Sequence, residues 1–479
     1  MSKHKINFLV AITMVLALGC KTTQYDTTAV NEKLPKKFDT NTDSASTTIA
    51  KWKDVFFDPH LVALIDTALK NNYDLRIALQ KVEFAKAGLK YNKGIRLPEL
   101  GINMAAGERK FGSYTMDGVG NYDTQFSPNI NDKQQIPDPL PDYYVGFQTS
   151  WEIDLWGKLK NKKKASAARF ISSQYGKDLI VTNLIAEIAS AYFDLLALDN
   201  EAKILIDNIE LQQEALDLVI AQKEAGRANE LGIEMMTAQL LNSKAIQAEV
   251  QQLALETQSK LNFLCGIYPQ SIKRDTSYFS QHLQTSLAAG IPSDLIKNRA
   301  DIRQSEFELK ASNADVRSAQ AAFYPTLNIN TALGLQSFNA LLLLETPASM
   351  AYNAAGGLAA PLLNRRKLKA DLMASKAEQK QAYINYEKTV VNSFKEVYIA
   401  LNNIENTKKM YELKNEEVEI LKRSIGTSSE LFKAGKANYL EIISSQKNKL
   451  QAELELTNLH KRQNIGIIEL YKAIGGGWR

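Results

Sequence analysis

The chain is poor in the residues that interrupt helices, and it has almost no cysteine. Its 479 residues include only 24 glycines, 12 prolines and 2 cysteines. Two cysteines cannot build the disulfide framework of a small secreted domain. Runs free of glycine and proline favour long helices, and four such runs cover residues 177–225, 233–265, 364–425 and 436–465. The composition therefore predicts a protein built mainly from long helices.

Sequence signatures of catalysis and of nucleic-acid binding are also missing. The chain contains no phosphate-binding loop, no His-Glu-X-X-His and no Gly-X-Ser-X-Gly. Its four histidines are scattered at positions 4, 60, 282 and 460. The net charge of +5 is small, and no basic stretch with interleaved aromatic residues occurs. We therefore expect a protein that is not an enzyme, holds no metal or cofactor and binds no nucleic acid.

The N-terminus has the pattern of an export signal. A basic "MSKHK" precedes the apolar "INFLVAITMVLAL", and Gly19 and Cys20 follow. A glycine before a cysteine is similar to a bacterial lipobox, in which the cysteine is diacylated. We expect a lipoprotein signal peptide at 1–19 and a lipid on Cys20. The alternative is cleavage without a lipid, because Ala17 stands where leucine is usual. No second continuous run of about 18 apolar residues follows, so we expect no membrane-spanning helix.

One short segment, Ala-Gly-(Arg/Lys)-Ala-Asn, occurs twice, at 225–229 and at 434–438. The offset of 209 between the two copies also aligns Asn183 with Asn392, and it holds without a gap from residue 181 to residue 266. A constant register over this length predicts two copies of one long helical hairpin. The repeated segment is the expected turn, because glycine and asparagine tolerate the left-handed conformation that ends a helix.

A second offset, 227, relates the segments that precede the two hairpins. It aligns "NYDLRIALQKVEFAKA" at 72–87 with "RADIRQSEFELKASNA" at 299–314, and Pro98 with Pro325. Asp301 with Arg303, or Asp315 with Arg317, are candidate structural ion pairs in this region. The sequence therefore predicts an internal duplication of nearly the whole body.

Within each copy the spacing of apolar residues changes along the chain. The first hairpin arm has a heptad seam with one polar member, which is typical of coiled-coil packing. Its members are Leu184, Ile188, Ala191, Leu195, Leu198, Ala202, Leu205, Ile209, Gln212, Leu216 and Val219.

The segments near the prolines alternate with a period of two. "YVGFQTSWEID" and "TLNINTALGLQ" each have one apolar face and one small or polar face. This alternation is typical of a transmembrane barrel strand, but a soluble sheet packed on a core has it too. Four strands cannot close a barrel, and an open sheet edge is not tolerated in a bilayer. If the strands lie in lipid, three chains with twelve strands are needed.

These features together resemble a known family, the outer-membrane efflux proteins of the TolC/OprM type, and in particular its NodT-like lipoprotein branch. The resemblance rests on "WEIDLWGKLK" at 151–160, "NRADIRQSEFELKASNADV" at 298–316, "AQAAFYPTLNI" at 319–329 and the two repeated turns. It covers about residues 50–475, and the motifs occur in the family's order.

The resemblance implies a mostly helical fold with a small β part. Three chains would form a homotrimeric duct whose long periplasmic hairpins make a coiled-coil α-barrel. Four strands from each protomer would contribute to one shared 12-stranded outer-membrane β-barrel. The implied partners are a periplasmic adapter (membrane-fusion) protein, an inner-membrane pump of the RND type and outer-membrane lipid. The chain itself would be a passive exit duct for drugs or metal ions in the outer membrane of a Gram-negative bacterium.

The repeat and the resemblance give an expected order of segments. The N-terminal anchor and equatorial segment is expected at 20–60, the first repeat at 61–266, an equatorial linker at 267–298, the second repeat at 299–475 and a tail at 476–479. Strands are expected near 98–112, 142–154, 325–336 and 349–361, and the helical hairpins at 157–266 and 364–475.

In the family the hairpin turns form the periplasmic tip of the duct. This implies adapter-docking turns made of Ala225, Gly226, Arg227, Asn229, Ala434, Gly435, Lys436 and Asn438. The inner hairpin carries the constriction in relatives, so the gate candidates are Phe432, Tyr439, Glu441 and Ser444. Ser444 falls where some relatives have a second acidic residue. The structural alternatives are that the first set are good turn formers and that Glu441 is an exposed carboxylate near a helix N-terminus.

Two other functions remain open from the sequence. The exit channel of a type I protein-secretion system has the same body fold, although the expected lipid favours small-molecule efflux. A structural coiled-coil surface lipoprotein without a pore is an alternative of another class. Such a spacer does not need amphipathic strands bounded by Pro98, Pro325 and Pro361.

Overall fold

The structure, a computed structural model, describes residues 24–35, 37–38, 51–226, 228–280, 292–361 and 365–478. The chain divides into two compact units, and each unit takes segments from both copies of the sequence repeat. One unit comprises Met1–Asp26, Lys86–Arg169 and Glu308–Tyr383, and we call it the sheet unit. The other comprises Thr27–Ala85, Phe170–Phe307 and Ile384–Arg479, and we call it the hairpin unit. The expected signal peptide at 1–19 and the expected lipidation site, Cys20, lie outside the described residues.

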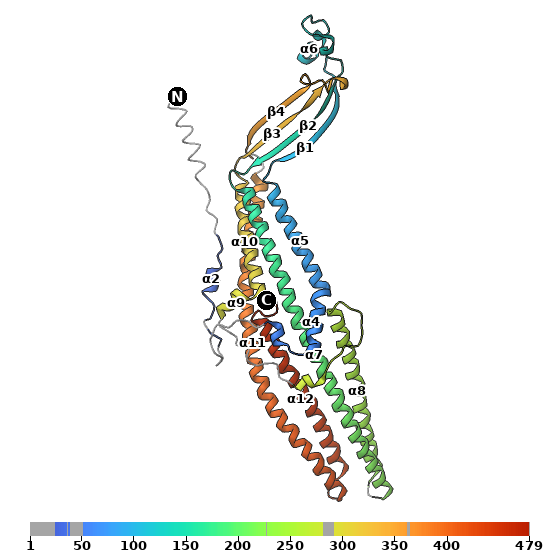
Figure 1. Ribbon diagram of the computed structural model, residues 1–479. Coiled ribbons are helices and arrows are strands. Elements are labelled where there is room, and N and C mark those ends of the chain that lie inside the picture. Colours follow the sequence, from blue (N-terminus) through green and yellow to red (C-terminus); the bar gives the residue numbers. More distant parts are fainter. Residues whose placement is uncertain are drawn as a thin grey trace. The chain divides into compact units, whose positions relative to one another are not determined.

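The sheet unit contains the four strands that the alternating segments predict. They are β1 (Glu99–Arg109), β2 (Leu140–Ile153), β3 (Thr326–Ser337) and β4 (Met350–Ala359). All pairings are antiparallel in the order β1-β2-β3-β4, so β1 and β4 are the two edges of this sheet (Figure 1).

Two connections join the strands at one end of the sheet. The β1–β2 connection contains α6 (Met116–Thr124) and the short 3-10 helix η1 (Asp132–Gln134). The β3–β4 connection contains η3 (Ala340–Leu342), and Lys133 Nζ lies 2.8 Å from Glu345 Oε1, joining the two connections. The connection with α6 is the larger of the two (Figure 1).

Helices make up most of the remaining described residues. Four of them contribute residues to both units: α5 (Tyr73–Gly94), α7 (Lys158–Glu224), α10 (Ala300–Ala321) and α11 (Arg365–Lys433). The hairpin unit alone holds α2 (Thr28–Asn31), α3 (Trp52–Val55), α4 (Pro59–Asn71), α8 (Glu230–Leu264), η2 (Thr276–Ser280), α9 (Pro292–Asn298) and α12 (Tyr439–Ala473). The fold is therefore mostly helical with one small antiparallel sheet, as the sequence predicts.

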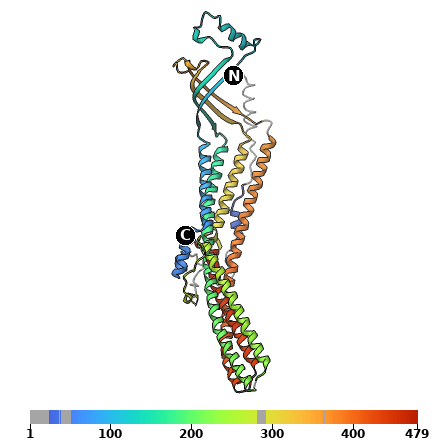
Figure 2. The ribbon, with the colours of Figure 1, turned by 90° about the vertical axis from the view of Figure 1, so that its right-hand side faces the viewer.

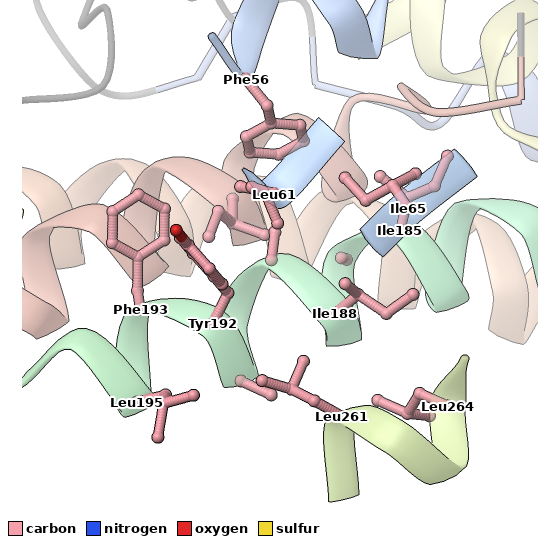
Figure 3. Close-up of a cluster of buried hydrophobic side chains, with 14 of the residues drawn as sticks. Phe56, Leu61, Ile65, Ile185, Ile188, Tyr192, Phe193, Leu195, Leu261 and Leu264 are labelled. Atoms are coloured by element: carbon pink, nitrogen blue, oxygen red, sulfur yellow. The ribbon is translucent and has the colours of Figure 1, made fainter. Parts of the chain in front are cut away.

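In the hairpin unit, α7 pairs with α8 and α11 pairs with α12, and the two hairpins run side by side (Figure 2). The heptad seam of α7 is confirmed, because each of its eleven members is buried or half-buried. Figure 3 shows an extensive apolar cluster, in which Ile188 and Tyr192 of α7 meet Leu61 of α4 and Leu261 of α8. The N-terminal helices are thus held against the hairpins by burial of apolar surface, which is the main stabilising force in folding.

Part of helix α7 is strongly apolar. It includes a stretch of 18 residues that is apolar enough to cross a membrane by composition, although the sequence shows no continuous apolar run there. In the structure 61% of this stretch is buried inside the protein. Its apolar character is explained by packing on several sides, since a helix that is apolar all round is typical of a protein core as well as of a membrane.

The structural elements follow both sequence offsets. Helix α10 begins and ends 227 residues after α5, and α12 begins and ends 209 residues after α8. In each copy, an equivalent side-chain hydrogen bond also joins the residue before the first helix to the end of the hairpin. Asn72 donates a hydrogen bond from Nδ2 to the Leu264 carbonyl (2.8 Å), and Arg299 donates from Nη1 to the Ala473 carbonyl (2.8 Å). Each side chain satisfies a carbonyl at the C-terminus of a hairpin helix, where no intrahelical donor remains.

Candidate functional site

The first candidate surface is formed by the two hairpin turns. In the first turn α7 ends at Glu224, Gly226 has φ +74°, and Asn229 caps α8 by accepting a hydrogen bond from the Gly232 amide (3.1 Å). Lys223 and Glu230 form an ion pair across the turn. Only glycine adopts a positive φ without strain, so the repeated glycine is required by the backbone.

The second turn has the same backbone conformation at its glycine, and its helix cap has one more hydrogen bond. Gly435 has φ +71°, and Asn438 Oδ1 accepts from the Leu440 amide at 2.7 Å. Glu441 Oε2 accepts in return from the Asn438 amide at 2.9 Å, which completes a capping box. The equivalent residue in the first turn is Gly232, which has no side chain for this role. The carboxylate of Glu441 is therefore exposed and engaged with its own helix end.

The predicted docking residues lie at the surface of these turns. Seven of them are exposed: Ala225, Gly226, Asn229, Ala434, Gly435, Lys436 and Asn438. The eighth, Arg227, lies outside the described residues. The turns offer backbone groups and small side chains to a partner, and their docking role stays a prediction.

The four predicted gate residues divide into two pairs. Phe432 is only 6% exposed and packs in an apolar cluster with Leu216, Val219, Met236, Leu240 and Ile442. Tyr439 is half-buried and packs against the same cluster, with its ring over Gly232. Glu441 and Ser444 are exposed and lie outside this cluster. Phe432 and Tyr439 thus join the two hairpins within one chain, and a pore-lining role for the four residues remains a prediction.

Sequence reasoning missed the close contact between the two tips. A Cβ placed on Gly232 would lie 3.0 Å from the Tyr439 ring, which is tighter than ordinary packing. The absence of a side chain at 232, where the other copy has Glu441, is the signal that could have indicated it. The lack of a Cβ lets α8 and α12 approach each other here.

Sequence reasoning also missed a layer of buried polar side chains between the hairpins. Gln212 is 3% exposed, and neither of its amide atoms has a hydrogen-bond partner among the described residues. Nearby, Asn208 donates to Glu453 Oε2 (3.2 Å) and Gln446 donates to the Leu211 carbonyl (3.4 Å). The polar member of the heptad seam was the sequence signal for this layer. A buried polar group without a hydrogen-bond partner costs free energy, so Gln212 makes the packing between the hairpins less favourable here.

The expected ion pairs form with other partners than the sequence suggested. Asp301 pairs with Arg299, and Arg303 pairs with Glu306 at 2.6 Å, so an Asp301–Arg303 pair is wrong. Asp315 pairs with Arg169 of α7 rather than with Arg317. Residues two apart within a helix do not face each other, which rules out both expected pairs, whereas Arg299 precedes the first residue of α10 and can reach Asp301.

The second candidate surface is one face of the sheet. Register places exposed apolar side chains in rows across all four strands, such as Ile102, Phe147, Leu333 and Tyr352. A second apolar row is Met104, Val145, Leu335 and Met350, in which the two methionines are exposed and the other two residues are half-buried. A contiguous exposed apolar patch marks a contact with a membrane or with another protein.

The opposite face of the sheet is polar or small. One of its rows is Gly101, Gln148, Ala332 and Asn353, and another contains the paired glycines Gly146 and Gly334. The ring of Tyr144 lies over these two glycines, where a Cβ on Gly334 would be 3.0 Å from the ring. The predicted alternation of the strands is therefore confirmed on both faces.

Comparison with known proteins supports this geometry. The family model described as outer membrane efflux protein matches residues 64–267 and 291–476. The chain is 26% identical over 429 residues to the pyoverdine export outer membrane protein OpmQ of Pseudomonas putida, covering 90% of this chain and 88% of that protein. It is 24% identical over 479 residues to the probable outer membrane lipoprotein SilC of Salmonella typhimurium, covering 99% of each.

A solved structure shows the same fold. The outer-membrane channel OprN superposes with a TM-score of 0.83 at 22% identity, covering 96% of this chain and 99% of that one. The fold match extends over both the sheet unit and the hairpin unit, and the family model covers most of both sequence repeats. The chain belongs to the outer membrane efflux protein family and is an outer-membrane efflux channel.

Proposed function

We propose that three copies of this chain assemble into a passive exit duct of a tripartite efflux system. The observation that carries the proposal is the four-stranded sheet with an exposed apolar face and two unpaired edges, β1 and β4. Unsatisfied backbone groups are not tolerated in lipid, so only closed barrels of strands span a membrane. Pairing β4 of one copy with β1 of the next closes twelve strands from three copies. The polar face of each sheet then lines the lumen.

The hairpin turns are the proposed contact with a periplasmic adapter protein. Two similar exposed turns in each of three chains present six docking positions. The inner-membrane pump, which we propose to be of the RND type, supplies the energy. We propose that the eight turn residues expected from the sequence, including Arg227, make these contacts with the adapter.

A lipid on Cys20 is the proposed second attachment to the outer membrane. The pattern of the leader supports it, and the relative SilC is itself described as a probable outer membrane lipoprotein. A lipid anchor, even a diacylated one, attaches a protein to the membrane less firmly than a spanning structure does, so the barrel is the principal anchor in this proposal. We also propose that the segments at 20–60 and 267–298 form the equatorial region of the duct, as the resemblance implies.

Small molecules are the proposed cargo. The relative OpmQ is described as exporting pyoverdine, which favours small-molecule efflux over the alternative of a type I protein-secretion channel. Among the described residues no group of three or more metal-binding side chains occurs. We propose that the chain performs no chemistry and that the pump selects the cargo.

The first experiment is mass determination of the detergent-extracted protein together with particle imaging. A trimer with one short barrel and six helical hairpins, two from each chain, supports the duct. A monomeric particle that remains soluble without detergent would exclude the pore and favour the structural lipoprotein.

A second experiment separates gating from helix capping at Glu441. Glu441→Gln removes the charge but keeps an oxygen that accepts from the Asn438 amide, whereas Glu441→Ala removes both. If three Glu441 carboxylates attract cations at the constriction, both variants lose cation selectivity in planar-bilayer conductance. If Glu441 is only a cap, Glu441→Gln conducts like the parent and the gate proposal fails.

A further inference from the structure

Positive charge is concentrated where three helices of the sheet unit adjoin the strands. Basic residues, with no acidic residue among them, occur in three segments: 86–96 at the end of α5, 158–164 at the start of α7 and 365–370 at the start of α11. These segments contain four, five and four basic residues, respectively. The whole chain has 58 basic and 53 acidic residues, so its small net charge conceals this separation. We call the three segments the basic belt.

The three segments lie at the same end of the sheet. Helix α5 ends five residues before β1 begins, and α7 and α11 begin within six residues of the ends of β2 and β4 (Figure 1). Helix α10 lies between α7 and α11 and contacts both. Side-chain hydrogen bonds join the neighbouring helices: Asn92 of α5 to Ser166 of α7 (2.7 Å), Ser318 of α10 to the Lys158 carbonyl of α7 (3.0 Å), and Gln379 of α11 to Asn313 of α10 (2.6 Å).

Most basic side chains at the starts of α7 and α11 have no acidic partner. Lys158 pairs with Glu152 at 2.6 Å, while the carboxylate of Asp154 accepts from two backbone amides of α7. Farther along α11 the charges are paired, as in Lys409 with Glu405. Within the part of the chain that the structure describes, eight exposed or half-buried basic residues of the belt form no ion pair: Lys160, Lys162, Lys163, Lys164, Arg365, Arg366, Lys367 and Lys369.

Helix stability does not account for these residues. Both α7 and α11 lack an acidic residue in the first turn and have basic residues there. The N-terminus is the positive end of the helix dipole, so it favours acidic side chains and disfavours basic ones. The basic belt is therefore unfavourable for the isolated chain, and an anion bound from outside would offset this repulsion.

The surroundings of the basic belt indicate which kind of anion fits. Trp156 lies between β2 and α7, is 44% exposed and stacks on Tyr324 with ring centres 4.9 Å apart. Its Nε1 donates to the Pro325 carbonyl at 2.8 Å. On the other side of Trp156, β2 carries the exposed apolar face of the sheet, which includes Phe147. Tryptophan and tyrosine between an apolar band and basic residues are typical of the headgroup level of a membrane. This order favours a lipid headgroup over an acidic protein.

We propose that the basic belt binds the phosphate groups of anionic phospholipids in the periplasmic leaflet of the outer membrane. The inference rests on the proposed function, which places the apolar face of the sheet in this membrane. Successive residues of a helix are turned by about 100°, so the basic residues at the start of α7 cover several sides of the helix. Whichever side faces the membrane therefore presents positive charge. Each basic residue near an anionic lipid surface strengthens attachment about five-fold.

The test titrates the full-length protein in an uncharged detergent with phosphatidylglycerol or with phosphatidylcholine of the same chain length, and native mass spectrometry counts the bound lipids. The parent should bind phosphatidylglycerol more tightly, and high salt should remove the difference because it screens the charges. The variant Lys160→Gln/Lys162→Gln/Lys164→Gln should bind phosphatidylglycerol more weakly by about five-fold or more, because at least one charge facing the membrane is lost.

The matched control is Lys244→Gln/Lys408→Gln/Lys447→Gln, which removes the same charge from the hairpin unit. These three lysines are exposed and form no ion pair within the described residues. The control should bind both lipids like the parent. Thermal unfolding without lipid gives a second measurement, in which the belt variant should be as stable as the parent because the helix dipole does not favour its lysines.

Four results would overturn the proposal. They are equal binding of the two lipids by the parent, equal weakening in the belt variant and the control, loss of stability of the belt variant without lipid, and tighter binding of a polyglutamate peptide than of phosphatidylglycerol. The last result would indicate an acidic protein as the partner. The same spectra give the mass of the assembly. An intact trimer that does not prefer phosphatidylglycerol refutes only this inference, whereas a monomer refutes the proposed duct and the lipid site with it.

Discussion

Arg299 is a buried arginine that binds three partners on three helices. Its side chain is 7% exposed and forms ion pairs with Asp301 and Glu396, both at 2.7 Å, besides its bond to the Ala473 carbonyl. Burial alone lowers the pKa of this guanidinium, but the hydrogen bonds and the attraction of Asp301 and Glu396 outweigh burial and leave the pKa above its ordinary value. The arginine therefore stays charged and joins α10, α11 and α12.

Arg299→Met should lower the free energy of unfolding by about 3–5 kcal/mol, because it leaves two carboxylates and a helix-end carbonyl without their partner. The matched control is Lys409→Met, which removes an ion pair whose two side chains are both exposed. Ion pairs between exposed side chains contribute little to stability. Thermal unfolding in detergent compares the two variants, and equal effects would contradict the importance of burial.

Cys265 gives a prediction about alkaline pH. Burial raises the pKa of its thiol from 9.0 to about 11. A raised pKa means that the folded state prefers the protonated thiol, so the stability is fully present below the unfolded value near 9 and is lost as pH rises through 11. The loss amounts to about 2–3 kcal/mol.

The parent protein should therefore lose stability between pH 8 and pH 11 by this amount more than Cys265→Ala does. Comparison of the two proteins cancels the titration of their other shared groups. Unfolding midpoints measured at both pH values provide the test. An identical pH dependence in parent and variant would show that the thiol does not titrate differently on folding.

At the scale of single elements, the hairpin turns show what the duplication preserves. Gly226 and Gly435 keep nearly the same φ, and Asn229 and Asn438 each cap the following helix, although they accept from different amides. Gly435→Ala should destabilise the turn by about 1–2 kcal/mol, because a Cβ is disfavoured in the left-handed conformation.

Gly426 of α11 provides the contrast for that substitution. It lies inside a helix without a positive φ, and a Cβ placed there meets nothing within 4 Å. Gly426→Ala should therefore stabilise the protein by roughly 0.5–1 kcal/mol. Opposite signs in thermal unfolding test the argument, and a loss at both positions would refute it.

At the scale of the whole molecule, the prediction concerns the sheet. Its two faces have different environments only after the proposed assembly. Phe147 lies on the exposed apolar face and Gln148, its neighbour, on the polar face. Phe147→Lys places a charge on the proposed lipid face, at a cost of roughly 2–4 kcal/mol near the membrane midplane. Gln148→Lys places the same charge toward the proposed lumen.

Outer-membrane fractionation and trimer yield measure the difference. Phe147→Lys should reduce the membrane-inserted trimer strongly, while Gln148→Lys should insert normally and change conductance only. Equal insertion of the two variants would mean that the apolar face does not contact lipid.

Much of the fold was predictable because it depends on local periodicity. The heptad seam in α7, the alternating strands and the two offsets each reflect geometry within one element or one copy. The ion partners of Asp301 and Asp315, and the Gly232–Tyr439 contact, were not predictable in this way. They depend on which helices lie side by side, and no local pattern records that.

The candidate site also combines features that local sequence sets with features that depend on tertiary packing. The sequence by itself determined the two turns, since a left-handed glycine and an asparagine cap act over a few residues, and it determined the two faces of each strand. Only the tertiary structure decided that Phe432 is buried between the hairpins and that the Tyr439 ring lies over Gly232. Burial is a property of surfaces brought together from distant parts of the chain, and its consequences for a side chain appear only when those surfaces meet.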